Sequence, residues 1–134
     1  MFKRAICITL ILPLMLIASC SSEPEPVGPP LEGEVDELAS EFINFLVAEE
    51  YTSARAFFNA EMSKAMSERA LKQAWEGTQS ELGGYVGEIE KQIQSTGEYE
   101  AVNVHSQFGD GQLNIRVVFD TDNRVAGLWF LPIE

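Results

Sequence analysis

Residues 113–131 read LNIRVVFDTDNRVAGLWFL, and this stretch decides the fold. Apolar and polar side chains alternate on both sides of TDNR, which has the residue types of a turn. A hairpin turn at Asp122-Asn123 places Val117 opposite Leu128. The same register gives two further apolar pairs, Ile115 with Phe130 and Phe119 with Ala126. The stretch therefore predicts two antiparallel strands with one apolar face.

Two more hairpins are expected upstream of this one. A turn at Asp110-Gly111 pairs Phe108 with Leu113 and Val104 with Val117, and a turn at Thr96-Gly97 pairs Ile89 with Val104. A slip of one residue would move every side chain of a strand to the opposite face. All three expected turns nevertheless place the apolar residues on the same face, which supports the predicted pairing. Together they place nearly all large aliphatic residues on one face of a four-stranded antiparallel meander.

Helical spacing precedes the strands. Apolar residues recur every three or four positions in residues 34–50, 51–66 and 67–82, which predicts three amphipathic helices. Thr52 or Ser53 is the expected cap of the second helix, Ser67 caps the third, and Gly83-Gly84 ends it. The expected fold class is α+β, with three N-terminal helices packed on one face of a curved, cone-like meander.

The first 20 residues have the layout of a lipoprotein signal peptide. Lys3 and Arg4 precede residues 5–19, which carry no charged side chain. This run is shorter than the ~20 apolar residues that cross a bilayer as a helix, and it suits a signal-peptide core. It ends in IASC at residues 17–20, which resembles the lipobox of prokaryotic lipoproteins. The resemblance implies cleavage before Cys20 and lipid on its sulfur; a plain cleaved leader and an uncleaved anchor are the alternatives.

The cysteine count limits the chemistry of the mature chain. Cys7 would leave with the leader, so Cys20 alone would remain and could form no internal disulfide. One Cys and one His are fewer than the three or four protein ligands of a zinc site. We expect no metal and no other cofactor, and Cys20 is the predicted lipidation site.

A tether and an acidic domain follow the leader. Residues 20–33, CSSEPEPVGPPLEG, are rich in Pro and Ser and are expected to be extended and unpacked. The net charge is -12, or -14 without residues 1–19, and it disfavours nucleic acids and anionic lipid headgroups as partners. Acyl chains such as palmitate on Cys20 would instead hold the protein to the cell membrane or the outer membrane. Residues 34–134 would form one domain on the extracytoplasmic side.

The sheet face that points away from the helices carries the candidate interaction surface. In the expected register His105, Arg116 and Trp129 form a row across three strands. Such a face is usually solvated, with Arg116 stacked on Trp129. An exposed Trp beside Leu131 would instead suit a partner or self-association surface. Catalysis by His105 is a third alternative, although Asp120 lies too far along the strand to orient it.

The order of these parts resembles a protein family. Phe42, the segments YTSARAFF and LKQAW, Gly83-Gly84 and the closing RVVFDTDNRVAGLWF are similar to domain of unknown function 3887 over about residues 35–132. That family resembles a variant of the ketosteroid-isomerase-like, or nuclear-transport-factor-like, cone. The resemblance implies frequent export or lipidation, and similar domains precede hydrolase domains in longer chains. Because this chain stops at Glu134, we expect no hydrolase activity of it.

These features predict a membrane-anchored lipoprotein of the cell envelope with a non-catalytic binding module for an envelope protein or a small apolar ligand. The alternative is an isomerase- or dehydratase-like enzyme with its active site in the cone pocket. Such enzymes use a carboxylate base and a Tyr or acid that stabilises an oxyanion. The face toward the helices offers Tyr85, Lys91 and Glu100 at strand ends, but its centre is apolar. The oligomeric state stays open, a homodimer included.

Overall fold

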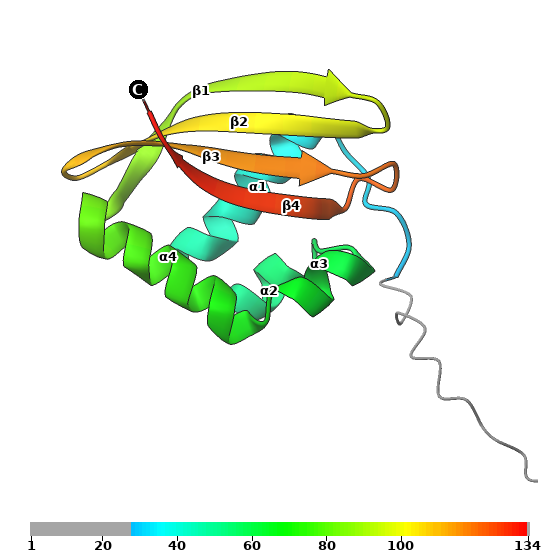
Figure 1. Ribbon diagram of the computed structural model, residues 1–134, viewed down its shortest axis with the longest axis horizontal. Coiled ribbons are helices and arrows are strands. Elements are labelled where there is room, and N and C mark those ends of the chain that lie inside the picture. The colour runs from blue at the N-terminus through cyan, green and yellow to red at the C-terminus, as the bar shows by residue number, and fades with distance from the viewer. Residues whose placement is uncertain (1–27, 134) are drawn as a thin grey trace, which may run out of the picture.

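The computed structural model describes residues 28–133, where four helices cover one face of a four-stranded antiparallel sheet (Figure 1). The strand order in the sheet, β1-β2-β3-β4, follows the chain. This confirms the α+β class and the meander. The elements are α1 (Val35–Val47), α2 (Tyr51–Arg55), α3 (Ala60–Ala65), α4 (Glu68–Leu82), β1 (Tyr85–Thr96), β2 (Tyr99–Phe108), β3 (Gly111–Phe119) and β4 (Val125–Pro132).

Helix α1 forms where the sequence predicted it, because its apolar stripe has helical spacing. Asp36 and Glu37 lie in the first turn, where their negative charge is favourable toward the helix dipole. The stripe packs under the sheet, and its buried members are Val35, Leu38, Ala39, Phe42, Ile43 and Leu46.

The prediction of one helix over residues 51–66 is wrong. Phe58 forms a parallel bridge with Val125 on β4, and this bridge separates α2 from α3. Two backbone bonds fix it, from Val125 N to Phe57 O at 2.7 Å and from Asn59 N to Val125 O at 2.9 Å. Asn59 Oδ1 then accepts from the Met62 N–H at 2.8 Å and caps α3. No side chain caps α2, which follows Glu50, so the expected cap at Thr52 or Ser53 is also wrong.

Helix α4 begins and ends as predicted. The Ser67 hydroxyl accepts from the Ala70 N–H at 3.1 Å, and the helix stops before Gly83. Gly83 has φ +82°, and a Cβ there would lie 3.1 Å from both Asp110 N and the Gly109 Cα. This close approach requires glycine, because it joins the end of α4 to the β2–β3 turn.

That junction sets the register between β2 and β3. The Asp110 N–H donates to Leu82 O at 2.7 Å, and the Gly109 N–H donates to Gly84 O at 2.9 Å. The turn is therefore Gly109-Asp110, with Phe108 opposite Gly111, and the expected turn at Asp110-Gly111 is wrong. Each β2 residue has a partner two positions from the expected one, with Val104 opposite Ile115. A register shift of two residues leaves each side chain on the same face of the sheet, so the predicted apolar face is still correct.

Strand β1 also departs from its predicted register, by up to two residues. It carries irregularities between Tyr85 and Gly87 and between Glu88 and Glu90, so that Lys91, and not Ile89, lies opposite Val104. Ile89 is 50% exposed, which corrects the expectation that it faces the helices. Because Thr96 pairs with Tyr99, the turn to β2 is Gly97-Glu98, and the expected turn at Thr96-Gly97 is wrong. Bulges of this kind are common on edge strands, which have no second neighbour to hold their register.

The β3–β4 hairpin has the expected pairing over most of its length. Val117 lies opposite Leu128 and Ile115 opposite Phe130, as predicted. Near the turn a register shift places Phe119 opposite Val125, not Ala126. Asp120 closes this longer turn, since its Oδ1 accepts from Asp122 N at 2.9 Å and from Arg124 N at 3.0 Å.

The segment just before α1 packs against the β3–β4 turn. The Leu31 N–H donates to Asp122 O at 2.9 Å, and Asn123 Nδ2 donates to the carbonyls of Leu31 and Gly33. Arg124 Nη2 donates to Pro29 O at 2.7 Å. The expectation of an unpacked tether is therefore wrong for residues 29–33. The predicted signal peptide and Cys20 lie outside the described residues.

Candidate binding site on the open sheet face

The interior between the helices and the sheet is filled by apolar side chains. Trp75 on α4 is fully buried and packs its ring against Tyr85, Phe108 and Phe130, with centroid distances of 5.8, 5.9 and 6.1 Å. The inward residues of β2 and β3 are likewise buried, among them Val102, Val104, Ile115, Val117 and Phe119.

The polar residues of this inward face make structural contacts. Lys91 Nζ donates to Ser40 Oγ at 2.9 Å and to Asp36 O at 3.3 Å, so it ties β1 to α1. Burial raises the pKa of Tyr85, the Glu88 carboxylate raises it further, and the Ser106 hydroxyl opposes both effects. Glu100 is exposed.

No element of residues 28–133 covers the opposite face of the sheet, and we call it the open face. It is defined by two rows of side chains that cross all four strands. Direct cross-strand neighbours point to the same side of a sheet, so each row lies on one surface. The first row is Gln92, Asn103, Arg116 and Trp129, and the second is Glu90, His105, Asn114 and Leu131.

The predicted site residues lie on this face but not in one row. Arg116 is opposite Trp129, as expected. His105 is opposite Asn114 instead of Arg116, because the β2–β3 turn begins one residue earlier than predicted. The expected stacking of Arg116 on Trp129 is not among the contacts of the described residues. The indole lies over Gly127, where an added Cβ would clash with the ring carbons Cη2 and Cζ3.

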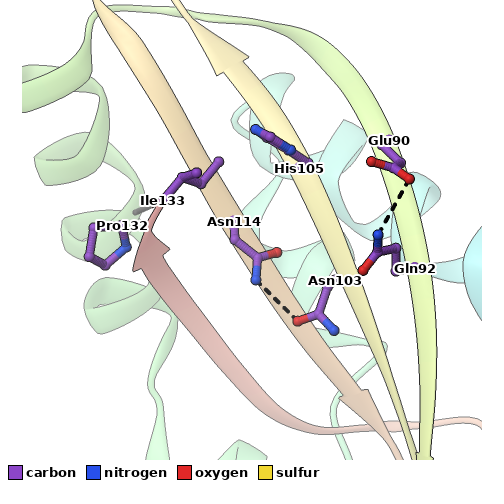
Figure 2. A pocket seen from close by; sticks show the side chains of 7 residues that line it. All are labelled: Glu90, Gln92, Asn103, His105, Asn114, Pro132 and Ile133. Atoms are coloured by element: carbon purple, nitrogen blue, oxygen red, sulfur yellow. Dashed lines mark hydrogen bonds between the residues drawn. The ribbon is translucent and has the colours of Figure 1, made fainter.

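A shallow pocket of about 390 Å³ lies on the open face. Figure 2 shows its polar side chains on strands β1, β2 and β3, with Pro132 and Ile133 beside them at the end of the chain. The pocket is lined by Glu90, Gln92, Asn103, His105, Asn114, Pro132 and Ile133. His105 is the only one of the three predicted surface residues that lines it.

Hydrogen bonds between neighbouring side chains hold the pocket walls. Asn114 Nδ2 donates to Asn103 Oδ1 at 3.1 Å, and Gln92 Nε2 donates to Glu90 Oε1 at 3.4 Å (Figure 2). Asn114 Oδ1 is buried and has no hydrogen-bond partner among the described residues. The walls therefore pair several of their polar groups with each other.

His105 is oriented by a glutamine at the rim of the pocket. Its Nε2 lies 2.9 Å from Gln112 Oε1. Because that oxygen only accepts, Nε2 is the donor of this hydrogen bond. Gln112 Nε2 in turn donates to Gln107 Oε1 at 3.1 Å. No group of three or more His, Cys, Asp or Glu in the described part of the chain could hold a metal ion.

Sequence reasoning gave no role to the residues that make most of this pocket. The sequence pattern predicted no site role for Glu90, Gln92, Pro132 or Ile133. The available signal was the repeated Asn and Gln at outward positions of the strands. None of the helices in residues 28–133 is long and apolar enough to cross a membrane.

The chain belongs to the family described as "Protein of unknown function (DUF3887)", whose family model matches residues 39–128. It is also similar to the esterase EstD of Thermotoga maritima, with 29% identity over 100 residues. The match covers 73% of this chain and 24% of the relative, so the chain spans about a quarter of the length of that curated protein. No solved structure matches.

Proposed function

We propose that this protein is a lipid-anchored, non-catalytic binding domain of the cell envelope and that its open face is the binding surface. The observation that carries the proposal is the contrast between the two faces of the sheet. One face is closed by a filled apolar core, and the other presents a polar pocket of about 390 Å³ beside an exposed Trp129. Pockets with convergent polar groups are the usual sites of ligand recognition.

The anchor part of the proposal rests on the sequence IASC at residues 17–20. Two or more acyl chains at Cys20 would hold the domain stably, which its acidic surface could not do. Because residues 29–33 are bound to the domain, only the chain from Cys20 to Pro29 is left as a spacer. An extended chain of that length spans at most about 32 Å.

The contacts of residues 29–33 with the domain also favour one orientation of the open face relative to the anchor. The chain enters beside the β3–β4 turn, at one end of the strands (Figure 1). The open face runs along the strands from that end, and it would therefore be presented at the side of the anchored domain. A ligand in the envelope could reach it without displacing the tether.

The anchor is tested by labelling the full chain with radioactive palmitate in the organism that produces it. We expect label on the wild type and on Cys7→Ala, and none on Cys20→Ala. Cys7→Ala is the matched control, since Cys7 lies within the predicted leader. Equal labelling of Cys20→Ala would exclude the anchor.

The binding surface is tested by site-specific photo-crosslinking. Benzoylphenylalanine replaces Gln92 on the open face or Gln73 on the exposed side of α4. After irradiation of intact cells, we expect a discrete adduct from position 92 and none from position 73. Adducts from position 73 alone, or from neither position, would contradict the assignment of the open face.

A further inference from the structure

Carboxamides dominate the polar chemistry of the open face. Cross-strand pairing places six of them on this side of the sheet, namely Gln92, Gln94, Asn103, Gln107, Gln112 and Asn114. A carboxamide offers both a donor and an acceptor, as does each hydroxyl of a sugar. The face is therefore suited to a ligand rich in hydroxyl groups.

Trp129 provides an aromatic platform in the same row as Asn103. Its ring rests against the backbone of Gly127 and is 48% exposed, so one broad side of the indole stays available. Aromatic faces attract the partly positive C–H groups of a sugar ring. Trp129 is two strands away from Asn103, or roughly 10 Å at the usual strand spacing. A ligand that uses both must be a chain, not a single sugar.

The position of the pocket argues against an extended peptide as the occupant. It lies over the middle of the sheet, where strands β2 and β3 have partners on both sides. Their backbone groups are used in the ladders, so a peptide strand could not add to the sheet there. Recognition at this site depends on side chains alone.

The charge of the protein disfavours acidic polysaccharides as ligands. The protein has a net charge of -12, which repels phosphorylated and uronic-acid polymers. The two rows of the open face contain one carboxylate, Glu90, and one guanidinium, Arg116. The face itself is thus nearly neutral, within an acidic molecule.

We infer that the open face binds a neutral oligosaccharide, with Trp129 as the stacking platform and the carboxamides and His105 as hydrogen-bonding partners of its hydroxyls. The inference rests on the proposed function and names its ligand class. The pocket is shallow and covers one side of the ligand, so dissociation constants of roughly 0.01–1 mM are expected.

The test uses the full chain in detergent, titrated with neutral tetrasaccharides of glucose, mannose and N-acetylglucosamine. Their monosaccharides and a tetramer of galacturonic acid serve as comparisons. Binding is measured by calorimetry and by acrylamide quenching of tryptophan fluorescence. Trp75 is fully buried, so a change in quenching reports on Trp129. We expect at least one neutral tetramer to bind, to protect Trp129, and to exceed its monomer about tenfold in affinity.

Variants then locate the bound sugar. Trp129→Ala is expected to weaken binding at least about tenfold, and Asn114→Ala several-fold. Val47→Ala and Asn44→Ala are the matched controls, because both residues are exposed on α1, and they should bind as the wild type does. Equal affinity of Trp129→Ala and the wild type would overturn the inference, as would preferential binding of the acidic tetramer.

The crosslinking experiment separates this inference from the proposed function. If no neutral tetramer binds at about 10 mM, a concentration well above the expected range, the carbohydrate assignment is wrong. A polypeptide adduct at position 92 would then keep the open face as a binding surface for a protein. Without any adduct at position 92, both the ligand class and the binding surface would be rejected.

Discussion

Arg124 joins three parts of the chain, and its removal should destabilise the domain measurably. The side chain is 8% exposed, with Nη1 donating to Ala56 O at 2.8 Å and Nη2 donating to Pro29 O at 2.7 Å. Arg124→Met keeps a long unbranched side chain and removes both donors. It therefore tests the two hydrogen bonds with little change in packing volume.

The expected loss of unfolding free energy follows from these two bonds. A hydrogen bond from a charged group contributes about 1.5–3 kcal/mol. Two effects reduce the sum: Pro29 O can turn to water, and the substitution removes a buried charge whose Nε has no partner among the described residues. We expect a net loss of about 2–3 kcal/mol, or roughly 10–20 °C in melting temperature for a domain of this size.

The assay is urea unfolding of the full chain, with the slope m checked for constancy between variants. Arg69→Met is the control, since Arg69 is exposed on α4, and it should change stability by less than about 0.5 kcal/mol. Hydrogen exchange at the Leu31 N–H, which donates to Asp122 O, should also accelerate in Arg124→Met. An Arg124→Met protein within about 0.5 kcal/mol of the wild type would refute this account of the clamp.

Three further predictions concern the core, the α4 junction and alkaline pH. Trp75→Ala should lower the free energy of unfolding by about 3–5 kcal/mol in thermal unfolding, because it empties a fully buried site. Trp129→Ala should lower it by about 1 kcal/mol or less. Similar losses for both variants would show that Trp129 is part of the core. Gly83→Ala should destabilise the domain by about 1–3 kcal/mol, because Gly83 has a positive φ and lies against the β2–β3 turn. Gly77→Ala is the control: this site has open space around it, so the substitution should stabilise α4 by about 0.5–1 kcal/mol. A Gly83→Ala protein as stable as the wild type would contradict the close approach. Burial raises the pKa of Tyr51 above 10.0, and Glu76 and Glu49 raise it further. The protonated hydroxyl therefore contributes to the free energy of unfolding in full below pH 10.0, and this contribution is lost as the pH rises through the folded-state pKa. Tyr51→Phe should flatten that alkaline loss in denaturant titrations and leave neutral stability equal or up to about 1 kcal/mol higher, because the Tyr51 hydroxyl is buried without a partner among the described residues; an unchanged alkaline slope would argue against this role.

Local patterns in the sequence determined the element types and the two faces of the sheet. The stripe of α1, the Ser67 cap and the alternation in Leu113–Leu131 depend on residues close together in the chain. Helical and strand periods assign a side chain to a face whatever its partner is. For this reason the apolar face and the exposed Trp129 were predicted correctly even where the register was not.

Tertiary contacts decided the features that bring distant residues together. The bridge of Phe58 to Val125 broke a segment with helical spacing, and the bonds of the β2–β3 turn to the end of α4 moved the register by two residues. Neither contact has a signal in the local sequence, because each joins segments far apart in the chain. The second one places His105 beside Asn114 and so forms the pocket. The outward polar residues could be read from the sequence, but only the folded register shows which of them share a site.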